Sequence, residues 1–153
     1  MRSEKETACF GSENDRSALT ERLTFMTRIL IIEDQLDIRK LLRMTLEFDV
    51  AEIHEAETGD AGWAMATEMR PDIVLLDVML PGKLNGLEVC RLIKAEPLLQ
   101  HTKVVMISAR ALSQDKDAGL AQGADVYMAK PFSAVELIDV IYRLQEPGGT
   151  AAP

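Results

Sequence analysis

Apolar and polar positions follow two alternating patterns along most of the chain. Short runs rich in Ile, Val and Leu are typical of buried parallel strands, and longer segments with apolar residues three or four apart are typical of amphipathic helices. We predict strands at residues 28–33, 51–55, 72–77, 103–108 and 125–128, and helices at residues 37–48, 58–69, 87–95, 113–122 and 133–145. Five strand–helix repeats imply right-handed crossovers and one parallel sheet with helices on both faces, an α/β fold.

The first and last predicted helices carry specific expectations about burial. In the first helix, the residues expected to share the buried face are Ile38, Leu41, Leu42, Thr45 and Leu46. In the last helix, the residues expected to face the core are Leu137, Ile138, Ile141 and Leu144. Ser133 and Glu136 have the spacing of a capping box at the start of this helix, and Gly123 is the expected C-cap of the preceding one.

Length and composition indicate one domain with short flanking segments. The chain has 153 residues, of which 47% are hydrophobic and 27% charged, which suits a globular domain with a full core. Residues 1–25 show no sustained periodicity and are predicted to be a poorly ordered leader. The domain is expected to span residues 26–146, and residues 147–153 to form a flexible tail.

Charge and hydropathy argue against several kinds of partner. The net charge of −8 disfavours direct binding to nucleic acid and to anionic lipid surfaces. Charged residues interrupt every apolar run before it reaches the length of a membrane span, and no secretory signal pattern is present, so we expect a cytoplasmic protein. Two cysteines do not form a disulfide framework, and Cys90 is expected to be a small buried residue.

Charged residues stand at the ends of three predicted strands. Glu33 and Asp34 end the first, Asp77 ends the third, and Lys130 follows the fifth. Open α/β sheets bind ligands at the carboxyl ends of their strands. Three carboxylates gathered there would raise one another's pKa unless a cation neutralised them, and oxygen ligands suit Mg²⁺, or Mn²⁺ as the alternative. We therefore predict a divalent-cation and phosphate site.

Asp77 is the candidate nucleophile of this site. It ends the most apolar strand, and a metal-held carboxylate there can attack phosphorus to form an acyl phosphate. Lys130 would supply a positive charge, and Ser108, at the end of the fourth strand, a hydroxyl donor to phosphoryl oxygens. Taken singly, Ser108 is more simply explained as a polar residue at a strand end.

Five motifs in this order make the chain resemble the receiver domain of two-component response regulators. They are Ile31-Ile32-Glu33-Asp34, the stretch from Leu75 to Gly82, Ile107-Ser108-Ala109, Gly123-Ala124-Asp125 and Lys130-Pro131-Phe132. The resemblance covers residues 28 to 145 and implies the flavodoxin-like fold, a three-layer (βα)5 sandwich with strand order 2-1-3-4-5.

The resemblance also implies a role for each residue of the site. Asp77 would accept a phosphoryl group from the phosphohistidine of a sensor histidine kinase or a phosphotransfer protein. Mg²⁺ would be bound by Asp34, by Asp77 and by the backbone carbonyl of Met79, with Glu33 acting through water. Ser108 and Lys130 would bind phosphoryl oxygens, so the chain would catalyse only its own phosphorylation and dephosphorylation and would not be a turnover enzyme.

The resemblance implies a conformational switch as well. Phosphorylation would draw Ser108 inward and let Tyr127 rotate from an exposed to a buried position. Met79 and Arg110 occupy positions that tune hydrolysis in this family, and the Lys130–Pro131 peptide is expected to be cis.

Few residues follow the last predicted helix, so we expect a single-domain regulator whose output is contact with a downstream protein effector. Val135 and Tyr142 are seven residues apart and share a face that should look outward. We interpret this face as a docking or homodimer surface, although scattered exposed apolar residues are common and need no function.

Three competing functions are weighed against this one. A phosphatase of the haloacid dehalogenase type would need a second Asp where Met79 stands, and a flavodoxin-like cofactor binder would need a Ser-, Thr- or Gly-rich loop where the acidic residues 34–37 stand. The third, a phosphorylation-independent pseudo-receiver that acts only as an interaction module, would not need the intact set of charged strand ends.

Overall fold

The computed structural model describes residues 27–47, 51–109 and 113–145. Its elements in chain order are β1 (Thr27–Ile32), α2 (Leu36–Leu46), β2 (Ala51–Ala56), α3 (Gly59–Met69), β3 (Ile73–Asp77), α4 (Gly86–Ala95), the 3₁₀ helix η1 (Pro97–Leu99), β4 (Lys103–Ser108), α5 (Ser113–Ala121), β5 (Val126–Ala129) and α6 (Ala134–Gln145). Each predicted strand and helix is present, and its ends differ from the prediction by at most two residues. The predicted leader and tail lie outside the described residues.

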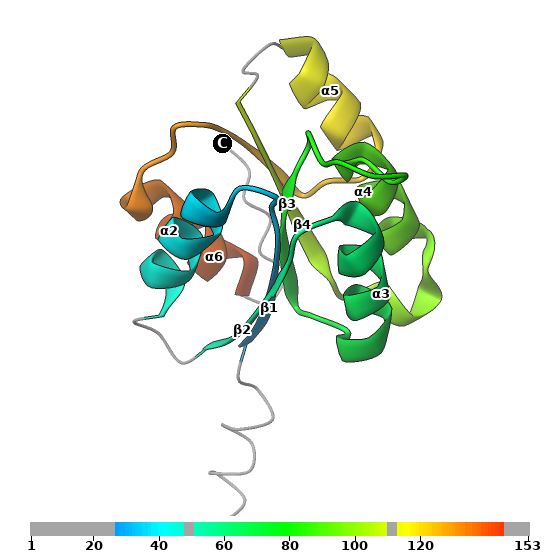
Figure 1. Ribbon diagram of the computed structural model, residues 1–153, viewed down its shortest axis with the longest axis horizontal. Helices are drawn as coiled ribbons and strands as arrows, with labels where there is room; N and C mark the ends of the chain where they lie inside the picture. The colour runs from blue at the N-terminus through cyan, green and yellow to red at the C-terminus, as the bar shows by residue number, and fades with distance from the viewer. Residues whose placement is uncertain (1–26, 48–50, 110–112, 146–153) are drawn as a thin grey trace, which may run out of the picture.

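The strands form one parallel sheet in the order β2-β1-β3-β4-β5, which confirms the predicted fold. Figure 1 shows α2 and α6 on one face of the sheet and α3, α4 and α5 on the other. The register pairs Ile32 of β1 with Leu76 of β3, and Asp77 with Ile107 of β4. The carboxyl ends of the three central strands therefore lie at the same edge of the sheet.

Two hydrophobic cores hold the helices to the sheet. Leu30 and Ile32 of β1 point into the core beneath α3 and α4, whereas Ile29 and Ile31 point into the core beneath α2 and α6. All four side chains are at most 1% exposed, and each contributes roughly 1.5–3 kcal/mol by leaving water. Because β1 is covered on both faces, its four consecutive apolar residues are what a central parallel strand requires.

The orientation of α2 differs from the prediction. Leu41 is 49% exposed, so it does not belong to the buried face, whereas Leu42, Thr45 and Leu46 do. Arg39 is buried instead, at 6% exposure, and faces the acidic side chains of β2 and the residues that follow it. The helix is thus rotated about its axis relative to the prediction. Arg39, with its ionic contacts, faces the protein, and Leu41 faces solvent.

The expectations for Cys90 and for the buried face of α6 have different outcomes. Trp63 packs against the first core, and Cys90 is fully buried there, where burial raises the pKa of its thiol to about 11. In α6, Val140 packs against the second core, while Ile138 is only partly buried and is not among the residues of that core. The buried face of α6 is therefore formed by Leu137, Ile141 and Leu144.

The predicted helix ends are confirmed. The Ser133 hydroxyl accepts a hydrogen bond from Glu136 N at 3.0 Å, and the Glu136 carboxylate accepts one from Ser133 N at 3.4 Å, which is the capping box. Gly123 follows α5 with φ of +97°, a conformation that glycine adopts without strain. Within the described part of the chain, no helix is long and apolar enough to cross a membrane.

Candidate functional site: an acidic cluster with a lysine

Three carboxylates converge at the carboxyl edge of the sheet. Glu33 follows β1 directly, Asp34 comes next, and Asp77 is the last residue of β3. One carboxylate oxygen from each lies within 4.8 Å of the others. Glu33 and Asp77 are buried, at 2% and 6% exposure, whereas Asp34 is exposed. Because β1 and β3 are neighbours in parallel, the sheet itself brings these groups together.

Lys130, the residue that follows β5, completes the cluster. Its Nζ lies 2.5 Å from Oε1 of Glu33 and 3.5 Å from Oδ2 of Asp77. The Lys130 amide also donates to the carbonyl of Ser108 at 2.7 Å, which ties the end of β5 to the end of β4. The peptide between Lys130 and Pro131 is cis, as predicted. A lysine from a distant part of the chain is therefore held against two of the three acids.

The electrostatics of the cluster favour a bound cation. Burial raises the pKa of Glu33, the adjacent Asp77 carboxyl raises it further, and Lys130 acts in the opposite direction. Partial desolvation and the neighbouring Glu33 raise the pKa of Asp34 as well. Carboxylates that disfavour their own charge in this way are stabilised as anions by a divalent ion, and three hard oxygen donors suit Mg²⁺. The residues present therefore fit the predicted metal.

The loop after β3 is built closely around Asp77. Met79 N donates to Oδ1 of Asp77 at 3.1 Å, and Gly86 N donates to the carbonyl of Val78 at 3.0 Å. A Cβ on Gly86 would lie 2.1 Å from the Asp77 carbonyl oxygen, so only glycine allows α4 to start this close to the strand end. The Met79 side chain is 55% exposed at this loop.

The remaining predicted site residues lie on the same edge or next to it. Ser108 is fully buried at the end of β4, one residue beyond the partner of Asp77 in the register. Tyr127 of β5 is partly buried, packs against the first core and lies close to Gly119 of α5. The predicted switch of Ser108 and Tyr127 remains a prediction, and Arg110 lies outside the described residues.

Arg39 is a member of this region that the sequence patterns did not indicate. Its Nη1 donates to the carbonyl oxygens of Glu33 and Asp34 at 2.9 and 3.1 Å, directly behind the acidic pair. An arginine in an amphipathic helix is ordinarily assigned to the solvated face, so periodicity alone could not find it. The available signal was the pair of acids Glu55 and Glu57 at the end of the second strand, which lie opposite Arg39.

The expected partner surface is exposed as predicted. Val135 is 77% exposed and Tyr142 50% exposed on the outer side of α6. Beside it, a hollow of about 460 Å³ lies between β5 and α6, lined by Val126, Tyr127, Met128, Ala129, Pro131, Glu136, Asp139, Val140 and Arg143. The outer side of α6 and this hollow therefore bring exposed apolar residues close to charged ones.

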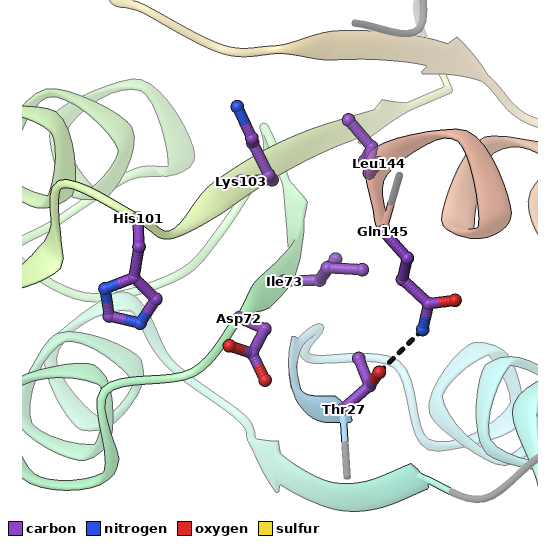
Figure 2. A pocket seen from close by; sticks show the side chains of 7 residues that line it. All are labelled: Thr27, Asp72, Ile73, His101, Lys103, Leu144 and Gln145. Carbon is purple, nitrogen blue, oxygen red and sulfur yellow. Dashed lines mark hydrogen bonds between the residues drawn. The ribbon is translucent and has the colours of Figure 1, made fainter. Parts of the chain in front are cut away.

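A second hollow lies at the opposite edge of the sheet. It has a volume of about 430 Å³ and is lined by Thr27, Asp72, Ile73, His101, Lys103, Leu144 and Gln145. In Figure 2 the side chains of Asp72, His101 and Lys103 point in different directions, and Gln145 donates to Thr27 at 2.6 Å. This hollow offers no convergent set of ligands comparable to the acidic cluster.

Comparison with known proteins agrees with the motifs. The family model of the response regulator receiver domain matches residues 29–142. The transcriptional regulatory protein ResD of Bacillus subtilis is 40% identical over 112 residues, which are 73% of this chain and 45% of ResD. The phosphate regulon transcriptional regulatory protein PhoB of Pseudomonas aeruginosa is 37% identical over 128 residues, 82% of this chain and 56% of PhoB. The chain thus spans about half the length of these curated relatives.

Solved structures match the same region. A putative response regulator from Chloroflexus aurantiacus superposes with a TM-score of 0.74 at 28% identity, covering 78% of this chain and 98% of the other. The chemotaxis response regulator CheY4 of Vibrio cholerae superposes with a TM-score of 0.72 at 26% identity, with the same coverage. Both similarities cover more than three quarters of this chain.

Proposed function

Because this chain belongs to the receiver-domain family of response regulators, we propose that Asp77 accepts a phosphoryl group from a phosphohistidine in a Mg²⁺-dependent reaction. The donor is a sensor histidine kinase or a phosphotransfer protein. The observation that carries the proposal is the convergence of Glu33, Asp34 and Asp77 within 4.8 Å, with Lys130 against two of them. No other cluster of three potential metal ligands occurs among the described residues.

The reaction forms one bond and breaks another on the same phosphorus. An oxygen of the Asp77 carboxylate attacks, the bond from phosphorus to the donor imidazole nitrogen breaks, and its electron pair stays on the imidazole. Lys130 is within reach of Asp77, so its ammonium can neutralise a phosphoryl oxygen that develops charge there. Ser108, at the adjacent strand end, is the proposed hydroxyl donor to a second phosphoryl oxygen.

The proposed metal ligands are those that the resemblance to receiver domains implies, and the clustering of three carboxylates supports them. Asp34, Asp77 and the backbone carbonyl of Met79 would hold Mg²⁺, and Glu33 would act through a water molecule. When bound, the ion would neutralise charge on the carboxylates and on the phosphoryl oxygens. Glu33 is occupied by Lys130 in this structure, which supports an indirect rather than a direct role for its carboxylate.

The proposed output is a change in protein contacts. Phosphorylation at Asp77 would move Ser108 and Tyr127, and Tyr127 lines the hollow between β5 and α6. Val135 and Tyr142 are exposed on α6, the helix that borders this hollow. They would bind a downstream effector or a second copy of the chain. Regulation of transcription belongs to the full-length relatives, and we propose no direct contact of this domain with nucleic acid because its net charge is −8.

We further propose a cytoplasmic protein that modifies only itself and is not a turnover enzyme. The alternative is a pseudo-receiver that acts without phosphorylation. The buried and charged set of Glu33, Asp77 and Lys130 argues against it, because an interaction module has no need of three ionisable groups at its strand ends.

Incubation with acetyl phosphate and Mg²⁺, followed by intact-mass measurement, tests the proposal. We expect one phosphoryl adduct on the wild type and on Glu68→Gln, a carboxylate control on the exposed side of α3, and none on Asp77→Ala or after removal of Mg²⁺ by a chelator. Beryllofluoride binding distinguishes rapid hydrolysis from a lack of transfer. Absence of both the adduct and beryllofluoride binding in the wild type would favour the pseudo-receiver.

A further inference from the structure

Arg39 is a buried cation directly behind the acidic cluster. Its side chain is 7% exposed, although it lies on a helix with a solvated face. Its guanidinium has an acceptor on each nitrogen: the carbonyls of Glu33 and Asp34 on Nη1, the Glu55 carboxylate on Nε at 3.3 Å, and the Glu57 carboxylate on Nη2 at 3.1 Å. A buried guanidinium is tolerated only when it is paired and hydrogen-bonded in this way.

The two carbonyl contacts fall on the turn that carries the predicted metal ligand. Nη1 lies 2.9 Å from Glu33 O and 3.1 Å from Asp34 O, so one donor group holds two successive peptide planes. Asp34 is exposed, whereas Glu33 is buried and its carboxylate contacts Lys130. The backbone of this turn sets where the Asp34 carboxylate starts, and Arg39 donates to both carbonyls of that backbone.

We infer that Arg39 is a positioning residue for the divalent-cation site: its guanidinium, held by Glu55 and Glu57, orients the Glu33–Asp34 turn so that the carboxylates converge with Asp77. The inference rests on the proposed function, since it concerns the same site. It makes the end of β2 part of the support of that site. Groups that hold metal ligands in place typically change metal affinity 10–100-fold when they are mutated.

Arg43 provides a matched control on the same helix. Its Nε donates to Oε2 of Glu55 at 2.6 Å and its Nη2 to the carbonyl of Ile53 at 3.2 Å. These contacts join α2 to β2 as those of Arg39 do, but they do not reach the acidic turn. If the arginines only fasten the helix to the strand, both should affect metal binding alike.

Lysine at position 39 separates charge from geometry. It would keep the positive charge but cannot donate to two carbonyls and two carboxylates from one planar group. Arg39→Lys should therefore weaken metal binding if the turn must be oriented, and should leave it unchanged if only the buried charge matters. Leu46→Ala, a core substitution at the far end of α2, destabilises the fold without touching the turn and controls for stability.

The test is Mg²⁺ affinity by isothermal titration calorimetry, with urea unfolding of each variant measured in parallel. We expect Arg39→Lys to bind Mg²⁺ about 10–100-fold more weakly than the wild type, and Arg43→Gln and Leu46→Ala to remain within about threefold. If Arg39→Lys is partly unfolded, the titration in trimethylamine N-oxide, which restores the compact state, should still show the deficit.

Two results have separate meanings. Mg²⁺ binding by wild type and Arg39→Lys with equal affinity, or an equal loss in Arg39→Lys and Arg43→Gln, would overturn the positioning role while leaving the proposed function intact. No Mg²⁺ binding by the wild type would instead reject the metal site on which both proposals rest.

Discussion

The ammonium of Lys130 lies 2.5 Å from the buried carboxylate of Glu33, closer than the 3.5 Å that separates it from Asp77. The lysine is thus bound by an acid that is not the proposed phosphoacceptor. Since Glu33 is 2% exposed, this contact is the principal compensation of a buried charge. If the Lys130 ammonium moved to a bound phosphoryl group, the Glu33 carboxylate would lose this contact. That loss would occur when Mg²⁺ and the phosphoryl group occupy the site.

Replacement of Lys130 by Met should therefore affect both stability and phosphorylation. We expect a loss of about 1–3 kcal/mol in the free energy of unfolding at pH 7, because buried carboxylates lose their charged partner. The loss should shrink toward pH 5, since protonation of Glu33 removes the unpaired charge. Urea unfolding over this pH range tests it, with Lys40→Met, an exposed lysine on α2, as the control. A pH-independent loss would contradict this account.

Glu33 and Glu52 should have opposite effects on the pH dependence of stability without metal. The pKa of Glu33 is raised in the folded protein by burial and by Asp77, so its charged form is disfavoured and stability falls as pH rises above its unfolded pKa. The pKa of Glu52 is lowered by its hydrogen bond to His54 and by Arg28, so its contribution is present above the unfolded pKa and is lost as pH falls.

Glu33→Gln should accordingly flatten the decline of stability with rising pH, and Glu52→Gln should flatten the decline at acid pH. The measurement is the free energy of urea unfolding between about pH 3.5 and about pH 8 in the presence of a chelator. The pH is varied in steps of about one unit so that the effect of each pKa can be resolved. Identical pH profiles for the two variants would show that the environments of these carboxylates do not differ as described.

Mg²⁺ should stabilise the folded protein, and more strongly at pH 7.5 than at pH 5. The ion binds deprotonated carboxylates, and the pKa values of Glu33 and Asp34 are both raised. At about 100 times the dissociation constant, we expect the free energy of unfolding to increase by about 2.7 kcal/mol. Asp34→Asn should remove most of this gain, and Asp60→Asn, outside the acidic cluster, should retain it. Equal stabilisation of both variants would place the ion elsewhere.

Gly86→Ala should destabilise the protein and disturb the Asp77 loop. The added Cβ would lie 2.1 Å from the Asp77 carbonyl oxygen and 2.7 Å from Val78 Cα, both of them backbone atoms that cannot rotate away. We expect a loss of about 1–3 kcal/mol by thermal or urea unfolding, together with slower phosphorylation. Gly119→Ala is the contrast. Its Cβ would meet a side chain, the Tyr127 ring at 3.1 Å, and not backbone atoms as at Gly86. Helix propensity also favours alanine over glycine by about 1 kcal/mol.

Tyr142→Glu should weaken self-association or effector binding without a change in phosphorylation. Tyr142 is 50% exposed on the outer side of α6 and is not a member of the acidic cluster, so the charge would act on contacts between molecules. Sedimentation of the beryllofluoride-treated protein measures the first effect and binding to an identified effector the second. Leu98→Glu, a similarly exposed residue on η1, is the control, and no difference between the two variants would remove the proposed role of this surface.

The amino-acid sequence determined the layered architecture and the location of the acidic groups. Runs such as Ile29–Ile32 and Ile73–Leu76 are apolar on both faces, which only a covered parallel strand accommodates, and this places Glu33 and Asp77 at strand ends. The resemblance to receiver domains supplied the strand order and the cis peptide, both confirmed by the structure. Local caps were readable because they depend on residues three positions apart.

Only the tertiary structure decided the rotation of α2 and the partners of the buried charges. Periodicity assigned Leu41 to the core and could not assign Arg39, because the burial of an arginine depends on acceptors from β2 and from the turn after β1. Likewise, Lys130 could be placed near the acids by strand order, but its closer contact with Glu33 than with Asp77 follows from side-chain geometry. Hydrophobic patterning records which face of an element is buried on average, whereas ionic contacts across the fold depend on distances that no local pattern contains.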